Sequence, residues 1–191
     1  MEQASNPNID ARSRIAVDLD EVTADTVSKR LQRYRMDYGE ELTRDQIHGK
    51  QIRDAVPSDR SKAVEACLDE PGFSRDIPIM PGARAVLEEL ATRFDILIAT
   101  SAMDHPASLY DRYLWLQEHL PFLSDRNYIF CGSKRYIRAD YLVDDNPRNL
   151  DLFAGTGILF HAHHNIHESR FPRLRNWEEV RSYFLAQIRT T

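Results

Sequence analysis

The stretch Arg14-Ile15-Ala16-Val17-Asp18-Leu19-Asp20-Glu21-Val22 decides the fold. Its apolar run is too short for a helix and is apolar on both faces, which is typical of a strand buried inside a parallel sheet. Two carboxylates follow at once, and open α/β sheets form their ligand crevice at the carboxyl ends of the strands. Side chains two residues apart in an extended chain face the same side. We therefore expect Asp18 and Asp20 to face a ligand site together.

The two carboxylates repel each other, and the repulsion needs an explanation. When they are about 4 Å apart, two like charges repel by roughly 4 kcal/mol at an effective dielectric constant of about 20. A bound cation, or the use of one carboxylate as a nucleophile, explains the pair. The alternative is structural: Asp18 starts a turn and Asp20 caps the following helix. The stretch by itself leaves both interpretations open.

Composition limits the class of protein. The chain has 191 residues, is 42% hydrophobic and 29% charged, and carries a net charge of -5, so we expect one globular domain with a small insertion. The acidic balance argues against binding a nucleic acid polymer, which needs a concentrated basic face. Cys67 and Cys131 form no disulfide framework, which indicates a reducing compartment. With no apolar run of membrane-spanning length and no signal-peptide pattern, we expect a soluble cytoplasmic protein.

Apolar residues between positions 25 and 79 recur at helical spacing, and no convincing strand interrupts them. Gly39 is placed to stop the first of these helices. Thr43 with Gln46 resembles a capping box that opens a short helix, and a further helix ends at Glu70-Pro71-Gly72. We therefore expect residues 25–79 to form a helical cap, inserted after the first strand of the sheet.

After the insertion, short apolar runs alternate with helical patterns. Further strands are expected at residues 94–99, 127–131, 141–143 and 157–160, with helices beginning near residues 83, 106 and 176. Strands that alternate with helices predict an α/β fold with a doubly wound, Rossmann-like parallel sheet. Residues 13–24 and 80–191 would then form the catalytic core around the cap.

Most of the predicted strands are followed by polar residues of the kinds that bind a metal ion or a phosphate group. Besides Asp18 and Asp20, these residues are Thr100, Ser101, Lys134, Asp144 and Asp145. The carboxyl ends of parallel strands lie on one edge, so the side chains converge there. Four carboxylates with one ammonium group carry an excess negative charge, and all-oxygen ligands favour Mg²⁺. Mg²⁺ beside a lysine and two hydroxyl groups predicts a phosphate site and phosphoryl transfer.

The four motifs, in this order, resemble those of the haloacid dehalogenase superfamily. Within it the chain is similar to the 5'(3')-deoxyribonucleotidase family. That likeness rests on the stretch Val17-Asp18-Leu19-Asp20-Glu21-Val22-Thr23-Ala24-Asp25, on Pro81-Gly82-Ala83 and Ala99-Thr100-Ser101, and on Lys134 placed ten residues before Asp144. The resemblance implies a Mg²⁺-dependent phosphomonoesterase that works through an aspartyl-phosphate and acts on nucleoside monophosphates.

The resemblance also implies a role for each motif residue. Asp18 is the implied nucleophile, and Asp20 the implied acid and base. The implied ligands of the phosphoryl oxygens are Thr100, Ser101 and Lys134. The implied Mg²⁺ ligands are Asp18, the backbone carbonyl of Asp20 and Asp144, with Asp145 beside them through water. The helical insertion is the implied cap over the substrate.

The cap of this family tends to supply aromatic side chains that sandwich the base. Phe73 matches one such position, which makes it a candidate substrate-binding residue; the alternative is that Phe73 belongs to the core. The tract Gly49-Lys50-Gln51-Ile52 is polar where aromatic residues are expected.

Alternative functions remain open at this point. One is a phosphatase for another small ester, such as a sugar phosphate. Another is a phosphoacceptor switch of the receiver type, although Lys134 here precedes the pair Asp144-Asp145, whereas receivers carry their lysine last. Histidines 161, 163, 164 and 167 lie in a polar loop without a zinc-like pattern of partners. The expected partner is a small phosphate ester, with no nucleic acid polymer and no membrane, and the protein is a monomer or a homodimer.

Overall fold

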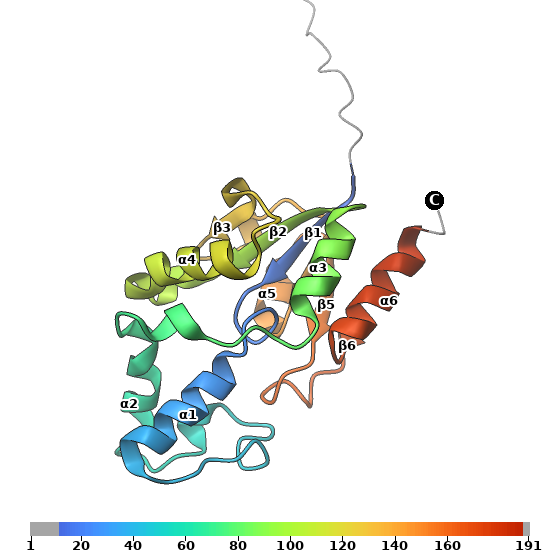
Figure 1. Ribbon diagram of the computed structural model, residues 1–191. Coiled ribbons are helices and arrows are strands. Elements are labelled where there is room, and N and C mark those ends of the chain that lie inside the picture. The colour runs from blue at the N-terminus through green and yellow to red at the C-terminus, as the bar shows by residue number, and fades with distance from the viewer. Residues whose placement is uncertain (1–11, 189–191) are drawn as a thin grey trace, which may run out of the picture.

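The computed structural model describes residues 12–188, and a parallel sheet forms their centre (Figure 1). The strands lie in the order β3-β2-β1-β4-β5-β6, and every neighbouring pair is parallel. Their bounds are β1 (Arg14–Asp18), β2 (Asp95–Thr100), β3 (Tyr128–Phe130), β4 (Tyr141–Asp144), β5 (Thr156–Phe160) and β6 (Arg173–Leu174). The predicted doubly wound α/β fold is confirmed, with β1 flanked by β2 and β4.

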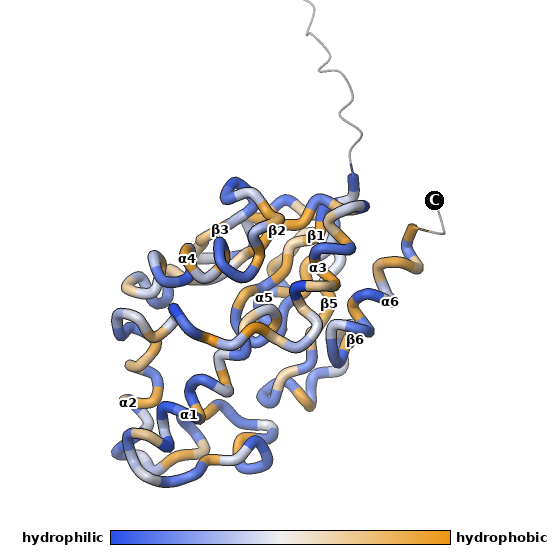
Figure 2. Tube along the Cα trace, in the orientation of Figure 1, coloured by the Kyte–Doolittle hydropathy of each residue, from blue (hydrophilic) through white to orange (hydrophobic). Residues whose placement is uncertain are grey.

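Helices cover both faces of the sheet because successive strand residues point to opposite sides. Ile15 and Val17 of β1 face a large apolar cluster shared with α3 (Ala83–Ala91), α4 (Leu109–His119) and α6 (Trp177–Ile188). Ala16 belongs to a second cluster with α5 (Pro147–Leu152). Apolar residues accordingly concentrate along the strands (Figure 2). None of the helices within residues 12–188 is long and apolar enough to cross a membrane.

The segment between residues 25 and 79 is helical and contributes no strand to the sheet. It contains α1 (Thr26–Tyr38), α2 (Ser61–Ala66) and the 3₁₀ helices η1 (Ile52–Asp54), η2 (Cys67–Asp69) and η3 (Phe73–Asp76). The helices α1 and α2 lie beyond the carboxyl end of β1 (Figure 1). This segment has an apolar cluster of its own, formed by residues such as Val27, Tyr34 and Ile52. Gly39 ends α1 in the left-handed conformation, with a φ of 66°.

Two tryptophans fix the places where the chain leaves the sheet and returns to it. Trp177 on α6 donates its indole N–H to the carbonyl of Val22 at 2.8 Å. Trp115 on α4 donates to the carbonyl of Ile77 at 2.6 Å. Both indoles are buried, so each bond satisfies a donor that would otherwise be costly to bury. The two connections of the helical segment are therefore anchored to the helices that cover the sheet.

The remaining 3₁₀ helices lie in the loops at the edges of the sheet: η4 (Ala102–Asp104), η5 (Pro106–Ser108), η6 (Asp125–Asn127) and η7 (Lys134–Tyr136). The expected short helix after Thr43 is wrong. Thr43 and Gln46 do exchange capping bonds, but residues 44–49 form turns. Gly49 has a φ of 76°, and its N–H donates to the carbonyl of His163 at 2.7 Å, so no helical ladder continues there.

Candidate active site

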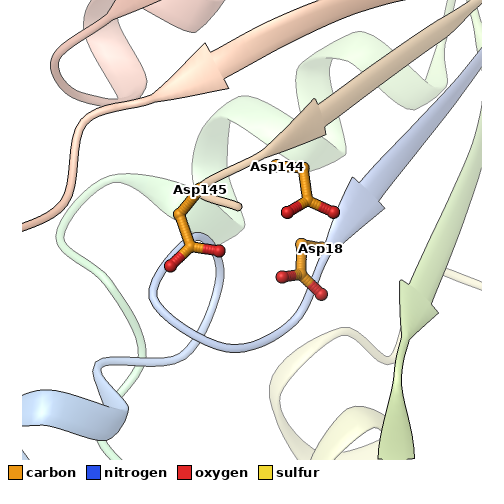
Figure 3. Close-up of side chains that lie close together, drawn as sticks. All are labelled: Asp18, Asp144 and Asp145. Carbon is orange, nitrogen blue, oxygen red and sulfur yellow. The ribbon is translucent and has the colours of Figure 1, made fainter. Parts of the chain in front are cut away.

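The carboxyl ends of β1 and β4 bring three carboxylates together (Figure 3). The two strands are paired, with Val17 opposite Val143, so Asp18 and Asp144 end neighbouring strands and Asp145 follows directly. One carboxylate oxygen from each aspartate lies within 4.8 Å of the others. All three side chains are buried.

Lys134 is the cation that the protein itself supplies to this cluster. Its Nζ lies 2.5 Å from Asp18 Oδ1 and 2.5 Å from Asp144 Oδ2, and the side chain is 1% exposed. Burial alone would lower the pKa of Lys134, but the contacts with Asp144 and Asp18 outweigh burial and raise it. The ammonium group is therefore charged and held between the two strand ends.

One ammonium group does not balance three buried carboxylates. Burial raises the pKa of Asp18 to about 7, even though Lys134 opposes the rise. Burial, together with Asp18 and Asp144, raises the pKa of Asp145 well above its ordinary value. A further cation would remove this repulsion, and the three oxygen ligands are of the kind that Mg²⁺ prefers. The residues present therefore fit a divalent cation.

Asp144 is fixed by amide groups as well as by Lys134. Asn149 donates its side-chain amide to Asp144 Oδ2 at 3.0 Å, and the backbone N–H of Asn146 donates to Oδ1 at 2.8 Å. Asn165 donates to the backbone carbonyl of Asp145 at 2.7 Å. Such supporting hydrogen bonds orient carboxylates before a ligand arrives.

Asp20 faces a different partner, Arg112 on α4, which the sequence analysis missed. Arg112 forms an ion pair with Asp20 Oδ2, and it also donates to the hydroxyl of Thr100 at 3.1 Å. The hydroxyl of Thr26 donates to Asp20 Oδ1 at 2.8 Å. Burial alone would raise the pKa of Asp20, but the charge and hydrogen bond of Arg112, with the bond from Thr26, lower it. These contacts therefore favour the ionised form of Asp20.

The structural alternative for Asp20, a helix cap, does not describe its contacts. Asp25 caps α1 by accepting the N–H of Ser28 at 3.0 Å. Glu21 accepts the N–H of Val27 at 2.6 Å, and its backbone adopts a φ of 58°, which is uncommon outside glycine. Capping is thus performed by neighbours, and the carboxylate of Asp20 faces the cavity.

A cavity of about 410 Å³ opens beside these groups. Asp18, Asp20, Ser101 and Asp145 line it, whereas Thr100, Lys134 and Asp144 lie behind this lining with 1% exposure or less. The structure thus brings all seven strand-end residues to one edge of the sheet. The helical segment contributes the opposite wall through Val27, Arg30, Gln51 and Leu68.

Phe73 is the one predicted site residue that the structure does not bring to this cavity. It is 5% exposed and packs in a small cluster with Cys67 and Leu68. The ammonium of Lys29 lies 5.9 Å from the centre of its ring. This placement favours the alternative in which Phe73 is a packing residue, and its base-stacking role stays a prediction.

Known proteins share both the sequence and the fold of this chain. The model of a family described as "5' nucleotidase, deoxy (Pyrimidine), cytosolic type C protein" matches residues 12–189. A Staphylococcus aureus protein is 42% identical over 179 residues, which are 93% of this chain and 98% of that protein. A 5'(3')-deoxyribonucleotidase of Clostridium acetobutylicum is 38% identical over 169 residues, which are 88% of this chain and 92% of that protein.

Solved structures of haloacid dehalogenase-like proteins have the same fold. Bacillus subtilis YfnB, determined bound to magnesium, superposes with a TM-score of 0.58 at 16% identity and covers 92% of this chain and 99% of that chain. A haloacid dehalogenase-like protein of Agrobacterium tumefaciens also gives a TM-score of 0.58, at 13% identity, over 93% of this chain and all of that chain. At such identities the likeness concerns the fold alone.

Proposed function

The chain belongs to the family of cytosolic type C deoxypyrimidine 5' nucleotidases, and we propose that it is a Mg²⁺-dependent 5'(3')-deoxyribonucleotidase that works through an aspartyl-phosphate. Its class is that of a nucleotidase, a hydrolase of phosphate monoesters. The observation that carries the proposal is the position of Asp18, which lies between the ammonium of Lys134 and an open cavity at the strand ends.

In this proposal Asp18 attacks the phosphorus of the substrate. A bond forms between a carboxylate oxygen of Asp18 and phosphorus, and the bond from phosphorus to the ester oxygen breaks. Lys134 is held at a fixed position by Asp18 and Asp144, so it stabilises the negative charge of the phosphoryl oxygens without first having to be ordered. The hydroxyl groups of Thr100 and Ser101 donate to the same oxygens.

Asp20 handles the protons. When the ester binds as its monoanion, Asp20 takes up the phosphate proton and gives it to the leaving alcohol oxygen. The resulting carboxylate then takes a proton from the water that hydrolyses the aspartyl-phosphate. Its contacts with Arg112 and Thr26 fix the carboxylate at the cavity wall. They also favour the ionised form that the second step requires.

The metal proposal rests on the donor set. Asp18, the backbone carbonyl of Asp20 and Asp144 would hold Mg²⁺, with Asp145 beside them through water. When bound, Mg²⁺ supplies positive charge that offsets the phosphate oxygens and the clustered carboxylates. The close approach of Asp18, Asp144 and Asp145, with the raised pKa values of Asp18 and Asp145, supports this assignment.

The helical segment at residues 25–79 is the proposed cap. It supplies one wall of the cavity, and closure over the substrate would exclude water from Asp18. The family description names a cytosolic type, which supports a cytoplasmic location for this protein as well.

A phosphate-release assay over a panel of esters tests the proposal. The panel contains deoxyribonucleoside 5'- and 3'-monophosphates, the matching ribonucleotides, and sugar phosphates, each assayed with Mg²⁺ and after exhaustive chelation. We expect the highest kcat/KM with deoxyribonucleotides and no turnover after chelation. A preference for sugar phosphates would replace the substrate assignment, and full activity after chelation would overturn the metal assignment.

A further inference from the structure

The wall of the cavity opposite the catalytic residues contains unpaired polar groups. Among residues 12–188, four buried side-chain nitrogen or oxygen atoms have no hydrogen-bond partner. Three of them belong to two residues that line the cavity, namely Nε of Arg30 and both ring nitrogens of His163. Buried polar groups in folded proteins are nearly always paired, because an unpaired one is costly. The three atoms are themselves covered in this structure, so a ligand in the cavity pairs with them once the two side chains turn toward it.

The chemistry of Arg30 points away from phosphate. Its Nη2 donates to the carbonyl of Val64 at 2.9 Å, and it forms an ion pair with Glu65, so its charge is already matched. The side chain is 11% exposed. Nε and Nη1 of Arg30 have no such bond, so the side chain still offers N–H donors that suit a neutral acceptor such as a carbonyl oxygen or a ring nitrogen.

His163 offers one donor and one acceptor. Burial, with the charges of His164, Arg30 and Arg44, lowers its pKa to about 4, so the ring is neutral at pH 7. A neutral imidazole carries one N–H and one bare nitrogen. Together with Arg30 it presents both donors and an acceptor, which matches the mixed edge of a nucleobase and not the all-acceptor surface of a phosphate.

The remainder of this wall agrees with recognition of a base by its edge. No phenylalanine, tyrosine or tryptophan lines the cavity within the described part of the chain. Val27, Leu68 and Leu152 supply the apolar lining on which the faces of a ring can pack. A base held here therefore gains its specificity from hydrogen bonds and not from aromatic stacking.

The wall is tied directly to the catalytic end of the cavity. Arg30 is on α1, whose first residue, Thr26, bonds Asp20. Next to His163, the Nε2 of His164 lies 3.5 Å from Asp145 Oδ2. The loop of His163 is itself held by its backbone, since its carbonyl accepts the N–H of Gly49 at 2.7 Å. The ring can therefore be replaced without loss of the bond that fixes the loop.

We propose that Arg30 and His163 recognise the hydrogen-bonding edge of the nucleobase and so select nucleotides over phosphate esters that lack a base. The proposal rests on the nucleotidase function proposed above and assigns two specificity-determining residues to it.

The test compares deoxyuridine 5'-monophosphate with 2-deoxyribose 5-phosphate, which is the same sugar phosphate without the base. Two variants each remove part of the pairing capacity: His163→Leu removes the ring nitrogens, and Arg30→Lys keeps the charge but removes Nε. The control is His167→Gln, in the same loop but exposed and outside the cavity lining. The melting temperature of every variant is measured alongside kcat/KM.

We expect each variant to lower kcat/KM for the nucleotide by about ten- to a hundredfold, as for loss of a buried hydrogen bond. The value for 2-deoxyribose 5-phosphate and both values of the control should stay unchanged. Equal losses on the two substrates, or no loss with His163→Leu, would overturn the inference. A wild-type enzyme that shows no preference for the nucleotide would also overturn the base-recognition inference, although the protein would still be a phosphatase. A wild-type protein that hydrolyses neither ester would instead overturn the proposed function.

Discussion

Arg112 on α4 forms an ion pair with Asp20, which lies 92 residues earlier in the chain. The arginine side chain is 4% exposed and the aspartate side chain 32% exposed, so one partner is buried and the other reaches the cavity. Because Arg112 also bonds the Thr100 hydroxyl, it joins the loop after β1 to the end of β2. The orientation of Asp20 therefore depends on a residue outside all four sequence motifs.

The first prediction is that Arg112→Gln lowers both stability and turnover. Loss of charged hydrogen bonds should reduce the free energy of unfolding by about 1.5–3 kcal/mol. Turnover should fall because Asp20 loses the partner that orients it. Arg112→Lys should keep part of the stability and part of the turnover. Urea denaturation and kcat on the three proteins measure this. An Arg112→Gln variant with wild-type kcat would show that Asp20 needs no such partner.

The sequence could have indicated Arg112 through helical spacing. Arg112 lies three residues before Trp115 and four before Leu116, on the face of α4 that is buried. A lone arginine on an apolar helix face needs a buried partner, and Asp20 was already a candidate. What the sequence could not supply is the direction in which α4 crosses the sheet, which decides which acid the guanidinium reaches.

The second prediction concerns a divalent cation. Mg²⁺ should raise the melting temperature of the wild-type protein because it binds only the folded cluster of Asp18, Asp144 and Asp145. A concentration of about 100 Kd corresponds to roughly 2.7 kcal/mol of stabilisation. Asp145→Asn removes one of the repelling carboxylates, so it should be at least as stable without Mg²⁺ and gain less from it. A melting temperature that Mg²⁺ leaves unchanged would contradict the metal site.

The third prediction separates two roles for Phe73. If Phe73 is a packing residue, as its 5% exposure favours, Phe73→Ala should cost about 3–5 kcal/mol of stability and affect all substrates alike. If Phe73 stacks on the base, Phe73→Ala should instead lower kcat/KM by the equivalent of about 1–3 kcal/mol, and only for nucleotides. Measuring kcat/KM for a nucleotide and for p-nitrophenyl phosphate, with urea denaturation, distinguishes them. A nucleotide-specific loss at unchanged stability would exclude the packing role.

The fourth prediction is a dependence of stability on pH that comes from His163. Its pKa in the folded protein is lowered from 6.5 to about 4, first by burial. Between these values the unfolded chain binds the proton and the folded protein does not, so this stability is present above pH 6.5 and lost as the pH falls toward 4. The free energy of unfolding should therefore fall more steeply on acidification in the wild-type protein than in His163→Leu. Parallel curves would show that burial does not perturb the histidine.

The fold was largely predictable because the apolar runs and their polar ends follow simple periodicities. The five strands from β1 to β5 were all expected within a residue or two of their observed bounds. The helix α5 was missed because six residues contain too few turns for a periodic pattern, and β6 was missed because it has only two residues. Such short elements form because of the residues packed around them, and their own sequences show too little periodicity to predict them.

The candidate site also has a part that could be predicted from the sequence and a part that could not. The strand-end residues were predictable because parallel strands deliver their ends to one edge, whatever the loops do. The cavity wall was not, because Arg30, Gln51 and His163 come from segments whose packing the sequence does not specify. The wall of the cavity therefore required the structure, as did the Arg112 partner of Asp20, whereas the cluster of polar residues at the strand ends did not.

The central claim is that Asp18 becomes phosphorylated during turnover. Two substitutions isolate the step: Asp18→Asn should lower kcat by at least about a thousandfold, because an amide is a poor nucleophile. Asp20→Asn should instead slow hydrolysis of the intermediate, most visibly with a leaving group such as p-nitrophenolate that needs no proton. Both variants replace an aspartate by an asparagine of the same size. The first should not form the aspartyl-phosphate, whereas the second should accumulate it.

The most direct measurement is peptide mass spectrometry of the Asp20→Asn protein, mixed with p-nitrophenyl phosphate and Mg²⁺ and quenched in acid. We predict a phosphoryl group on the peptide that contains Asp18, and none on the same peptide from a protein that also carries Asp18→Asn. Absence of phosphate from this peptide, combined with an Asp18→Asn single variant that retains a tenth of the wild-type kcat, would contradict the account.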